Sequence, residues 1–195
     1  MEIYYVNTVY INYLRHKADR NVLTNEQDGR LRPYVGVVFT INSFNYFVPL
    51  SSPKPSDYIL INGISTIRKS IVPIHRIIIT DCGEIDFFGK LKFSNMIPIP
   101  NGEFRLLDIQ GITDIRYKSI IENQIRYIRK HKDMLMKNHA NVIYQQKTKN
   151  LPIGYLKSTV DFRLLEQVCN EYEIITQNLA EPALQAASGD DTLQI

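Results

Sequence analysis

The sequence of 195 residues has few cysteines, few histidines and no long apolar run. Its two cysteines, Cys82 and Cys169, are too few for a disulfide framework or a metal cage, and they fit a reducing cytosol. No stretch reaches the roughly 18 apolar residues of a membrane span, so no membrane partner is expected. The first residues lack a basic region followed by an apolar one, so we expect no secretory signal and a cytoplasmic protein.

Motifs for metal and nucleotide chemistry are missing as well. His131 and His139 stand eight residues apart, which is not the four-residue spacing of a helical zinc site. The sequence contains no CxxC pair, glycine-rich phosphate loop or GxSxG motif. These absences argue against zinc enzymes, kinases and other NTPases, Rossmann enzymes and serine hydrolases, and we expect neither metal nor cofactor.

Charge is unevenly distributed, although the net charge is only +3. Residues 114–160 hold ten Lys or Arg and three Asp or Glu, whereas residues 161–195 hold one Arg and seven acidic residues. The basic block, which includes Arg126 and Lys130, suits the phosphate backbone of a nucleic acid. A solvated outer helix face is the alternative interpretation.

The first half is rich in β-branched and aromatic residues. Strands are predicted over residues 3–6, 34–41, 46–50, 75–80, 85–93, 96–99 and 104–109. The second and third of these form a hairpin around turn residues 42–45. Asn7 is placed to cap a short helix. Residues 19–33 are predicted as a loop, and residues 59–74 fit either a short helix or a strand.

The second half is helical in pattern. From Asp114, apolar residues recur at intervals of three and four, which predicts one amphipathic helix or two in series. Ser158 or Thr159 can cap a final helix. Strands without crossover helices, followed by helices, favour an α+β fold with an antiparallel sheet. We expect one domain over residues 1–178 and a disordered acidic tail over 179–195.

The segment PLSSPKP at 49–55 is the strongest candidate for chemistry. A predicted strand delivers Ser51, Ser52 and Lys54 into a turn that prolines stiffen. The Lys54 ammonium can stabilise a phosphate or its pentavalent transition state, and the serine hydroxyls can donate to phosphate oxygens or relay a proton. An ordinary exposed turn and a PxxP-like ligand for another protein are the alternatives.

Aromatic residues next to basic ones form a second candidate group. Tyr10 and Tyr13 lie near the N-terminus, and Arg32 and Tyr34 flank Pro33 before the hairpin. Such pairs suit single-stranded RNA, because bases stack on the rings while phosphates pair with the cations. Core packing of Tyr10 or Tyr13 is the alternative.

Taken in order, these segments resemble the ToxN/AbiQ family, the protein toxins of type III toxin–antitoxin systems. The resemblance covers roughly residues 3–173. It rests on the YxxYL element at 10–14, RPYVGVV at 32–38, YFVPLSSPK at 46–54, KFSNMIPIP at 92–100, YKSII at 117–121 and STVDFRLLE at 158–166. It implies a compact, strongly bent antiparallel sheet similar to the MazF/Kid toxins, with flanking helices.

The resemblance also implies a metal-independent endoribonuclease. The 2′-hydroxyl of the substrate attacks the adjacent phosphate, leaving a 2′,3′-cyclic phosphate and a 5′-hydroxyl. The inhibitor is a small structured antitoxin RNA, cut from a repeat precursor, that closes with the toxin into a cyclic assembly. The biological context is phage abortive infection or plasmid maintenance.

Residue by residue, Ser52 and Lys54 match the family's active-site serine and phosphate-holding lysine. Ser51 stands where the family often has threonine, and Tyr10 matches a tyrosine that lines the site. Three more residues transfer as RNA-binding candidates, namely Arg32, Tyr34 and Asn95.

Two features depart from this pattern or stay open. Residues 56–80 look longer than the corresponding family stretch, and an insertion there could reshape the RNA groove. No general base is apparent near the loop in sequence, although His75 could approach it in the fold. A non-catalytic RNA-binding module and a protein-interaction domain are the alternative functions.

Overall fold

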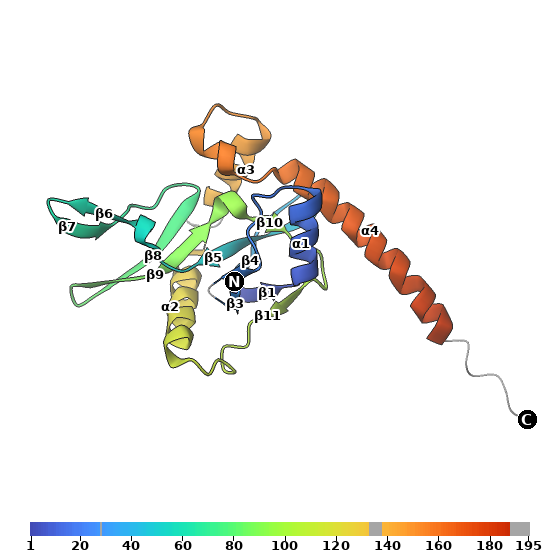
Figure 1. Ribbon diagram of the computed structural model, residues 1–195, viewed down its shortest axis with the longest axis horizontal. Coiled ribbons are helices and arrows are strands. Elements are labelled where there is room, and N and C mark those ends of the chain that lie inside the picture. Colours follow the sequence, from blue (N-terminus) through green and yellow to red (C-terminus); the bar gives the residue numbers. More distant parts are fainter. Residues whose placement is uncertain (28, 133–137, 188–195) are drawn as a thin grey trace, which may run out of the picture.

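The computed structural model describes residues 1–27, 29–132 and 138–187. Helices and two short hairpins flank one large sheet (Figure 1). The strands are β1 (Glu2–Val6), β2 (Glu26–Gln27), β3 (Arg30–Leu31), β4 (Pro33–Ile41), β5 (Phe44–Ser51), β6 (Tyr58–Ile61), β7 (Ile64–Ile67), β8 (Ile74–Asp81), β9 (Glu84–Lys92), β10 (Ile97–Pro98) and β11 (Phe104–Leu106). The helices are α1 (Thr8–Lys17), α2 (Ile115–Lys132), α3 (Asn138–Thr148) and α4 (Phe162–Ala187). Short 3₁₀ helices are η1 (Pro55–Asp57), η2 (Phe93–Asn95) and η4 (Gly154–Ser158).

The large sheet has seven strands in the order β11-β1-β4-β5-β9-β8, with β10 also paired to β5. Its pairings are antiparallel. This architecture confirms the predicted α+β class and the antiparallel sheet. Strands β2 and β3 pair separately, and so do β6 and β7.

Local sequence explains the best-predicted elements. The β4–β5 hairpin turns through Asn42 and Ser43, whose positive φ angles of 50° and 70° match a tight two-residue turn. Helix α1 begins after Asn7, whose side chain accepts a hydrogen bond from the Val9 N–H at 2.9 Å, as predicted for a cap.

Three segments can be compared with the sequence prediction. The stretch predicted as a loop at 19–33 contains β2 and β3, which differs from the prediction. The stretch 59–74, predicted as a short helix or a strand, contains nearly all of the β6–β7 hairpin, in agreement with the strand alternative. Helix α4 continues to Ala187, past Asn178, where the predicted disordered tail begins. The remaining part of the predicted tail, 188–195, lies outside the described residues.

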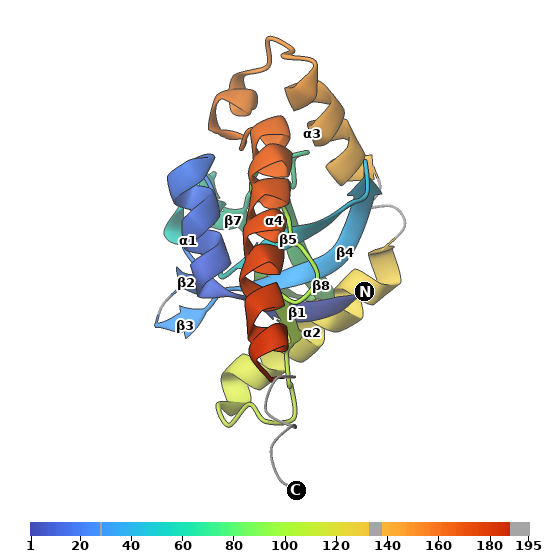
Figure 2. The ribbon, with the colours of Figure 1, turned by 90° about the vertical axis from the view of Figure 1, so that its right-hand side faces the viewer.

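Buried aromatic residues join the sheet to the helices. Tyr46 on β5 and Tyr144 on α3 both donate to Glu166 Oε1 on α4, at 2.8 and 2.9 Å. The first part of α4 lies beside α1, where the rings of Tyr10 and Tyr172 pack 4.9 Å apart (Figure 2). The rest of α4 extends away from the body (Figure 1). No helix among the described residues is both long and apolar enough to cross a membrane.

Candidate functional site

A row of three polar side chains crosses neighbouring strands at one end of the large sheet. Ser51 on β5 lies opposite Lys90 on β9, and Lys90 lies opposite Arg76 on β8. Directly paired residues in antiparallel strands share a face of the sheet. Register alone therefore brings a hydroxyl, an ammonium and a guanidinium together, and all three residues are buried.

Arg32 fixes Ser51 from the neighbouring chain segment. Its Nη1 donates to Ser51 Oγ at 2.9 Å, and its Nε donates to the carbonyl of Thr24 at 2.9 Å. Only 7% of Arg32 is exposed. Arg32 therefore supports the serine loop from a buried position, and RNA binding by Arg32 stays a prediction.

The PLSSPKP segment leaves the sheet immediately after this row. Strand β5 ends at Ser51, and η1 begins at Pro55, so the residues between them form a tight connection. Ser52 and Lys54 are exposed there, while Ser51 is buried. The structure thus brings the predicted Ser51, Ser52 and Lys54 to one place, with two of the three presented to solvent.

The buried carboxylate of Asp57 closes the turn that follows Lys54. Asp57 Oδ1 accepts a hydrogen bond from Arg76 at 3.0 Å, and Asp57 Oδ2 pairs with the Lys90 ammonium. Burial by itself raises the pKa of Asp57, but hydrogen bonds from Lys90 and from the Lys54 N–H outweigh it, so the net pKa lies below its usual value. Asp57 is therefore charged at neutral pH.

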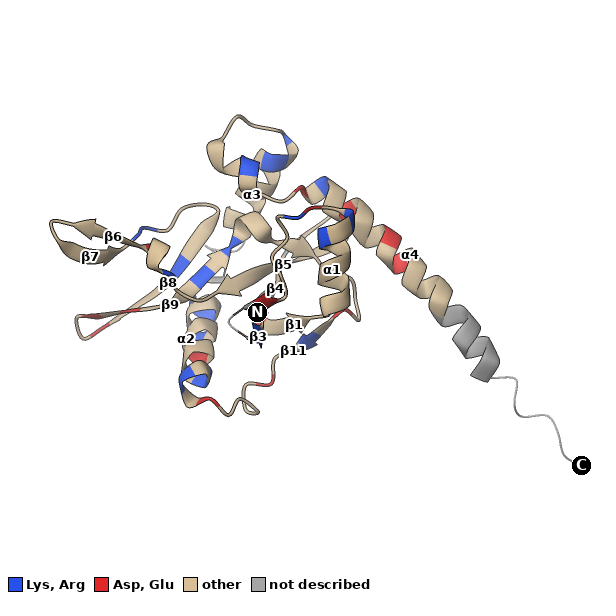
Figure 3. Cartoon of the chain, in the orientation of Figure 1, with Lys and Arg blue, Asp and Glu red and all other residues tan. Residues whose placement is uncertain are grey.

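The surroundings of the turn are electropositive. Lys92, two residues beyond Lys90 on β9, is half-buried, and burial together with the charges of Lys90, Arg32 and Lys54 lowers its pKa. One carboxylate, Asp57, balances part of this charge. Figure 3 shows Lys and Arg on β8, β9 and α2, and acidic residues on α4 and towards the β8–β9 tip. Such a surface favours a polyanion.

A pocket of about 190 Å³ lies beside the serines, between the loop and α2. Its wall includes Phe88, Tyr117 and Gln124 together with Ser51 and Ser52. The Gln124 amide nitrogen donates to the Phe88 carbonyl at 2.6 Å. The pocket offers aromatic and amide surface next to the candidate catalytic hydroxyls.

Two predicted site residues lie in the core. Tyr10 has no exposed surface, and its hydroxyl donates to the carbonyl of Pro98 at 2.8 Å. Tyr34 is 1% exposed, and burial raises its pKa. Both rings fill the interior beneath the sheet, which favours core packing, and the roles of Tyr10 in the catalytic site and of Tyr34 in RNA binding stay predictions.

The other RNA-binding candidates are scattered. Asn95 is largely buried, and its amide nitrogen donates to the Asn21 carbonyl at 2.9 Å. It borders a groove of about 500 Å³ that Lys92 also lines. Arg126 and Lys130 are exposed on one stripe of α2, away from the serine loop in sequence and on a different element.

Among the described residues, the contacts of the His75 ring are with α2 and α3 and not with the loop 51–54. Its Nε2 lies 2.9 Å from the Tyr127 hydroxyl, and its ring packs 5.5 Å from that of His139. These partners belong to α2 and α3, whereas its neighbour Arg76 points to Asp57. Alternation along β8 thus directs His75 to the opposite face.

His75 should make the free energy of unfolding fall as the pH is lowered. Burial, with the nearby charges of His139 and His131, lowers the pKa of His75 to about 4. The unfolded chain binds this proton more readily, so the stability from neutral His75 is present above about pH 6.5 and is lost as pH falls toward 4. We expect a loss of about 2 kcal/mol across this window, because the ring is partly exposed.

Urea unfolding between pH 7 and pH 4.5 checks this expectation. His75→Gln should flatten the pH dependence, while the control His16→Gln, at an exposed position, should leave it as in the wild type. An unchanged slope in His75→Gln would contradict the assignment.

Arg76, Lys90, Lys92 and Asp57 were not identified from the sequence. A usable signal was present, because Arg76 interrupts the apolar run HRIIIT and Lys90 and Lys92 alternate with buried Leu91. Charged side chains inside buried strands are rare unless they are paired. Which partner each one meets depends on strand register, which the sequence did not define.

Comparison with known proteins gives consistent matches. The family model for the toxin ToxN of type III toxin–antitoxin systems matches residues 2–170. The chain is 31% identical over 175 residues to the endoribonuclease ToxN of Bacillus thuringiensis subsp. kurstaki, covering 86% of this chain and 82% of that protein. It is 29% identical to the endoribonuclease AbiQ of Lactococcus lactis subsp. lactis, covering 88% and 89%.

Two solved structures share the fold. One is AbiQ, a lactococcal anti-phage endoribonuclease of a type III toxin–antitoxin system, with a TM-score of 0.70, 27% identity and coverage of 88% of this chain and 97% of that chain. The other comes from a type III system whose toxin is selectively inhibited by a non-coding RNA pseudoknot, with a TM-score of 0.67, 29% identity and coverage of 88% and 97%. The match over residues 2–170 confirms the resemblance seen in the sequence, and the chain belongs to the ToxN family of toxins from type III toxin–antitoxin systems.

Proposed function

We propose that the chain is an endoribonuclease toxin that cleaves RNA at the loop 51–54. The observation that carries this proposal is the exposure of Ser52 and Lys54 on a stiff turn above the buried cations Arg76 and Lys90. The curated relatives in Bacillus and Lactococcus are endoribonucleases, which supports the same activity.

The reaction is an internal transesterification. The 2′-oxygen of the RNA attacks the adjacent phosphorus, the bond from phosphorus to the 5′-oxygen breaks, and a 2′,3′-cyclic phosphate and a 5′-hydroxyl result. Lys54 offsets the charge that builds on the phosphorane oxygens. Ser52 donates to a non-bridging oxygen or relays a proton to the departing 5′-oxygen.

Ser51 has a supporting role in this scheme. Its hydroxyl accepts a hydrogen bond from Arg32 and its backbone pairs with Lys90, so it holds the loop on the sheet. The pocket beside Ser52 has room for a base next to the scissile phosphate. The 2′-hydroxyl proton passes to water, because His75 faces α2 and α3. A slow enzyme follows, since a positioned acid–base group contributes about 10²–10⁴ in rate.

The experiment is end mapping of cleaved RNA. The purified chain is incubated with a mixed RNA pool in EDTA, and the new ends are characterised. Discrete cuts with 2′,3′-cyclic phosphate and 5′-hydroxyl ends are expected. Intact RNA that still shifts on a gel would instead indicate a non-catalytic binding module.

We further propose that a small structured repeat RNA is the antitoxin and that it closes with the toxin into a cyclic protein–RNA assembly. The solved relative inhibited by an RNA pseudoknot supports the first part. The exposed cations Arg126 and Lys130 on α2 offer contacts to its phosphates. We also propose a single domain over 1–178, a sheet bent as in the MazF/Kid toxins, and action in the cytoplasm on cellular or phage RNA.

The α2 stripe should contribute electrostatically to RNA affinity. Arg126→Ala/Lys130→Ala is expected to weaken binding about tenfold and to lower the slope of log K against log salt by about 1.4–1.8, because each phosphate contact contributes about 0.7–0.9. Binding titrations at several salt concentrations measure both. The control Lys17→Ala/Arg163→Ala removes two exposed charges from α1 and α4. An equal slope change in both variants would contradict a role specific to α2.

A further inference from the structure

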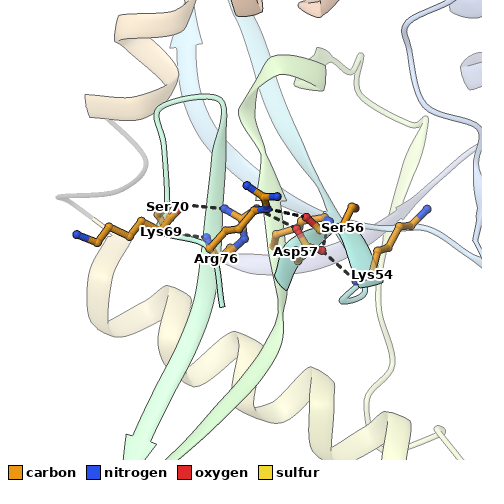
Figure 4. Close-up of polar contacts among 8 residues, drawn as sticks. Lys54, Ser56, Asp57, Lys69, Ser70 and Arg76 are labelled. Atoms are coloured by element: carbon orange, nitrogen blue, oxygen red, sulfur yellow. Dashed lines mark hydrogen bonds and ion pairs between the residues drawn. The ribbon is translucent and has the colours of Figure 1, made fainter. Parts of the chain in front are cut away.

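Asp57 contacts the catalytic loop and two strands at once, as Figure 4 shows in part. It is 2% exposed. Its Oδ2 accepts the backbone N–H of Lys54 at 2.9 Å and also pairs with the Lys90 ammonium, while Oδ1 accepts from Arg76 at 3.0 Å. The Asp57 carboxylate therefore takes part in three separate interactions, and one of them is with the backbone of Lys54.

The turn between Lys54 and Asp57 is closed in both directions. The Asp57 N–H donates to the Lys54 carbonyl at 2.9 Å, which is the reciprocal of the bond from the Lys54 N–H to the Asp57 side chain. Pro53 and Pro55 on either side of Lys54 each fix a φ angle. The Lys54 backbone is thus held on both sides, although its side chain is exposed.

The ion pairs attach this turn to a defined position on the sheet. Lys90 and Arg76 are direct partners across β9 and β8, so Asp57 spans two strands at one register. Ser51 pairs with the same Lys90. The Asp57 carboxylate therefore also sets the position of Lys54 relative to Ser51. A change at Asp57 is therefore expected to move Lys54 before it moves Ser51, which Arg32 holds separately.

The same residue lies at the base of the β6–β7 hairpin. The Asp57 carbonyl accepts the Arg68 N–H at 2.8 Å, and Arg76 donates to the Lys69 carbonyl at 2.7 Å. Both ends of the segment that carries β6 and β7 are therefore tied to the Asp57–Arg76 pair. Because this pair closes the base of the segment, the β6–β7 hairpin leaves the loop 51–54 in place.

We propose that Asp57 is the positioning residue for Lys54: it fixes the Lys54 backbone from which the ammonium reaches the scissile phosphate, and it does not touch the RNA. This inference rests on the proposed function of the loop 51–54. It predicts that Asp57 affects the rate through Lys54 and has little effect on the affinity for substrate.

A double-mutant cycle tests the role. Single-turnover cleavage is measured for the wild type, Asp57→Ala, Lys54→Ala and the double variant. Asp57→Ala is expected to lower the maximal rate about 10–100-fold with less than a threefold change in the half-saturating protein concentration. In the Lys54→Ala background the same change should cost less than threefold. A residue needed only for folding would lower activity by the same factor in both backgrounds, and that result would overturn the proposal.

Loss of the carboxylate leaves two buried cations, so a second variant guards against misfolding. Asp57→Ala/Lys90→Met removes one of them and should show the same dependence on Lys54. Asp86→Ala, which removes an exposed carboxylate from β9, is the control and should cleave as the wild type.

Hydrogen exchange of the Lys54 amide gives a readout independent of activity. The amide should be protected in the wild type and in Asp86→Ala, and should exchange at least tenfold faster in Asp57→Ala/Lys90→Met. Unchanged protection in that variant would overturn the proposal. A wild type that cleaves no RNA but shows the expected exchange pattern would instead count against the proposed function and leave the contact from Asp57 to Lys54 established.

Discussion

Lys54→Ala is expected to slow RNA cleavage by about 10²–10³-fold, the usual effect of removing one preorganised group that stabilises transition-state charge. RNA binding should fall far less, because the loss of one phosphate contact lowers the salt slope by only about one unit. Single-turnover rates and equilibrium binding of the same RNA separate the two effects.

The reason lies in how Lys54 is held. Its side chain is exposed, and its backbone is fixed by Asp57 and by the flanking prolines, so the side chain starts from a defined point beside Ser52. Lys69→Ala is a suitable control, because Lys69 is an exposed lysine near the Asp57–Arg76 pair. Equal rate losses in both variants would show that general electropositive charge, rather than the loop, drives cleavage.

Gly89→Ala is expected to lower the free energy of unfolding by about 2–4 kcal/mol and to reduce cleavage at least tenfold. Gly89 has a φ of +126°, and a Cβ there would lie 2.7 Å from the Ser51 carbonyl oxygen and 2.9 Å from Gln124 Nε2. One of these contacts is backbone, so the end of β5 must move. Ser51 and the loop beyond it would move with it.

Gly83→Ala is the matched control. Gly83 also has a positive φ, of +88°, but a Cβ there meets nothing within 4 Å. It should cost about 1 kcal/mol of stability and leave cleavage unchanged. Urea unfolding and cleavage rates measure both variants. If Gly83→Ala destabilised the protein as much as Gly89→Ala, backbone strain rather than contact with Ser51 would be the cause.

The loop 51–54 could be proposed as a site from the sequence because its polar side chains are neighbours along the chain. Ser51, Ser52 and Lys54 lie between prolines at the end of an apolar strand, so composition and local stiffness were visible together. The strand pattern was equally local, and β4, β5, β8 and β9 lie close to their predicted ranges. Their alternation and turn residues carry that information.

The support beneath the loop could not be predicted in the same way. Asp57, Arg76 and Lys90 converge only because β8 and β9 pair in one register and η1 folds over them. A one-residue slip would have sent Lys90 to the other face. The burial of Tyr10 and Tyr34 could not be predicted for a related reason, since both have the residue types of an RNA surface but lie at inward-facing positions.

The end of α4 shows the limit of composition. The residues after Asn178 include alanine, leucine and glutamine, which favour helix, but they lack a clear apolar period and were predicted as disordered. Helix α4 includes residues up to Ala187. The prediction of a disordered tail rested on small and acidic residues and on the missing apolar period, whereas helix propensity is a separate signal.

The most direct test of the catalytic account uses a modified substrate. An RNA with one mapped cut and the same RNA carrying a single 2′-deoxynucleotide on the 5′ side of that cut are compared in EDTA under single-turnover conditions. The account predicts that the all-ribose RNA is cut to a 2′,3′-cyclic phosphate, whereas the deoxy RNA binds with similar affinity and stays intact at that position. Cleavage of the deoxy RNA at the same rate would contradict attack by the 2′-hydroxyl at the loop 51–54.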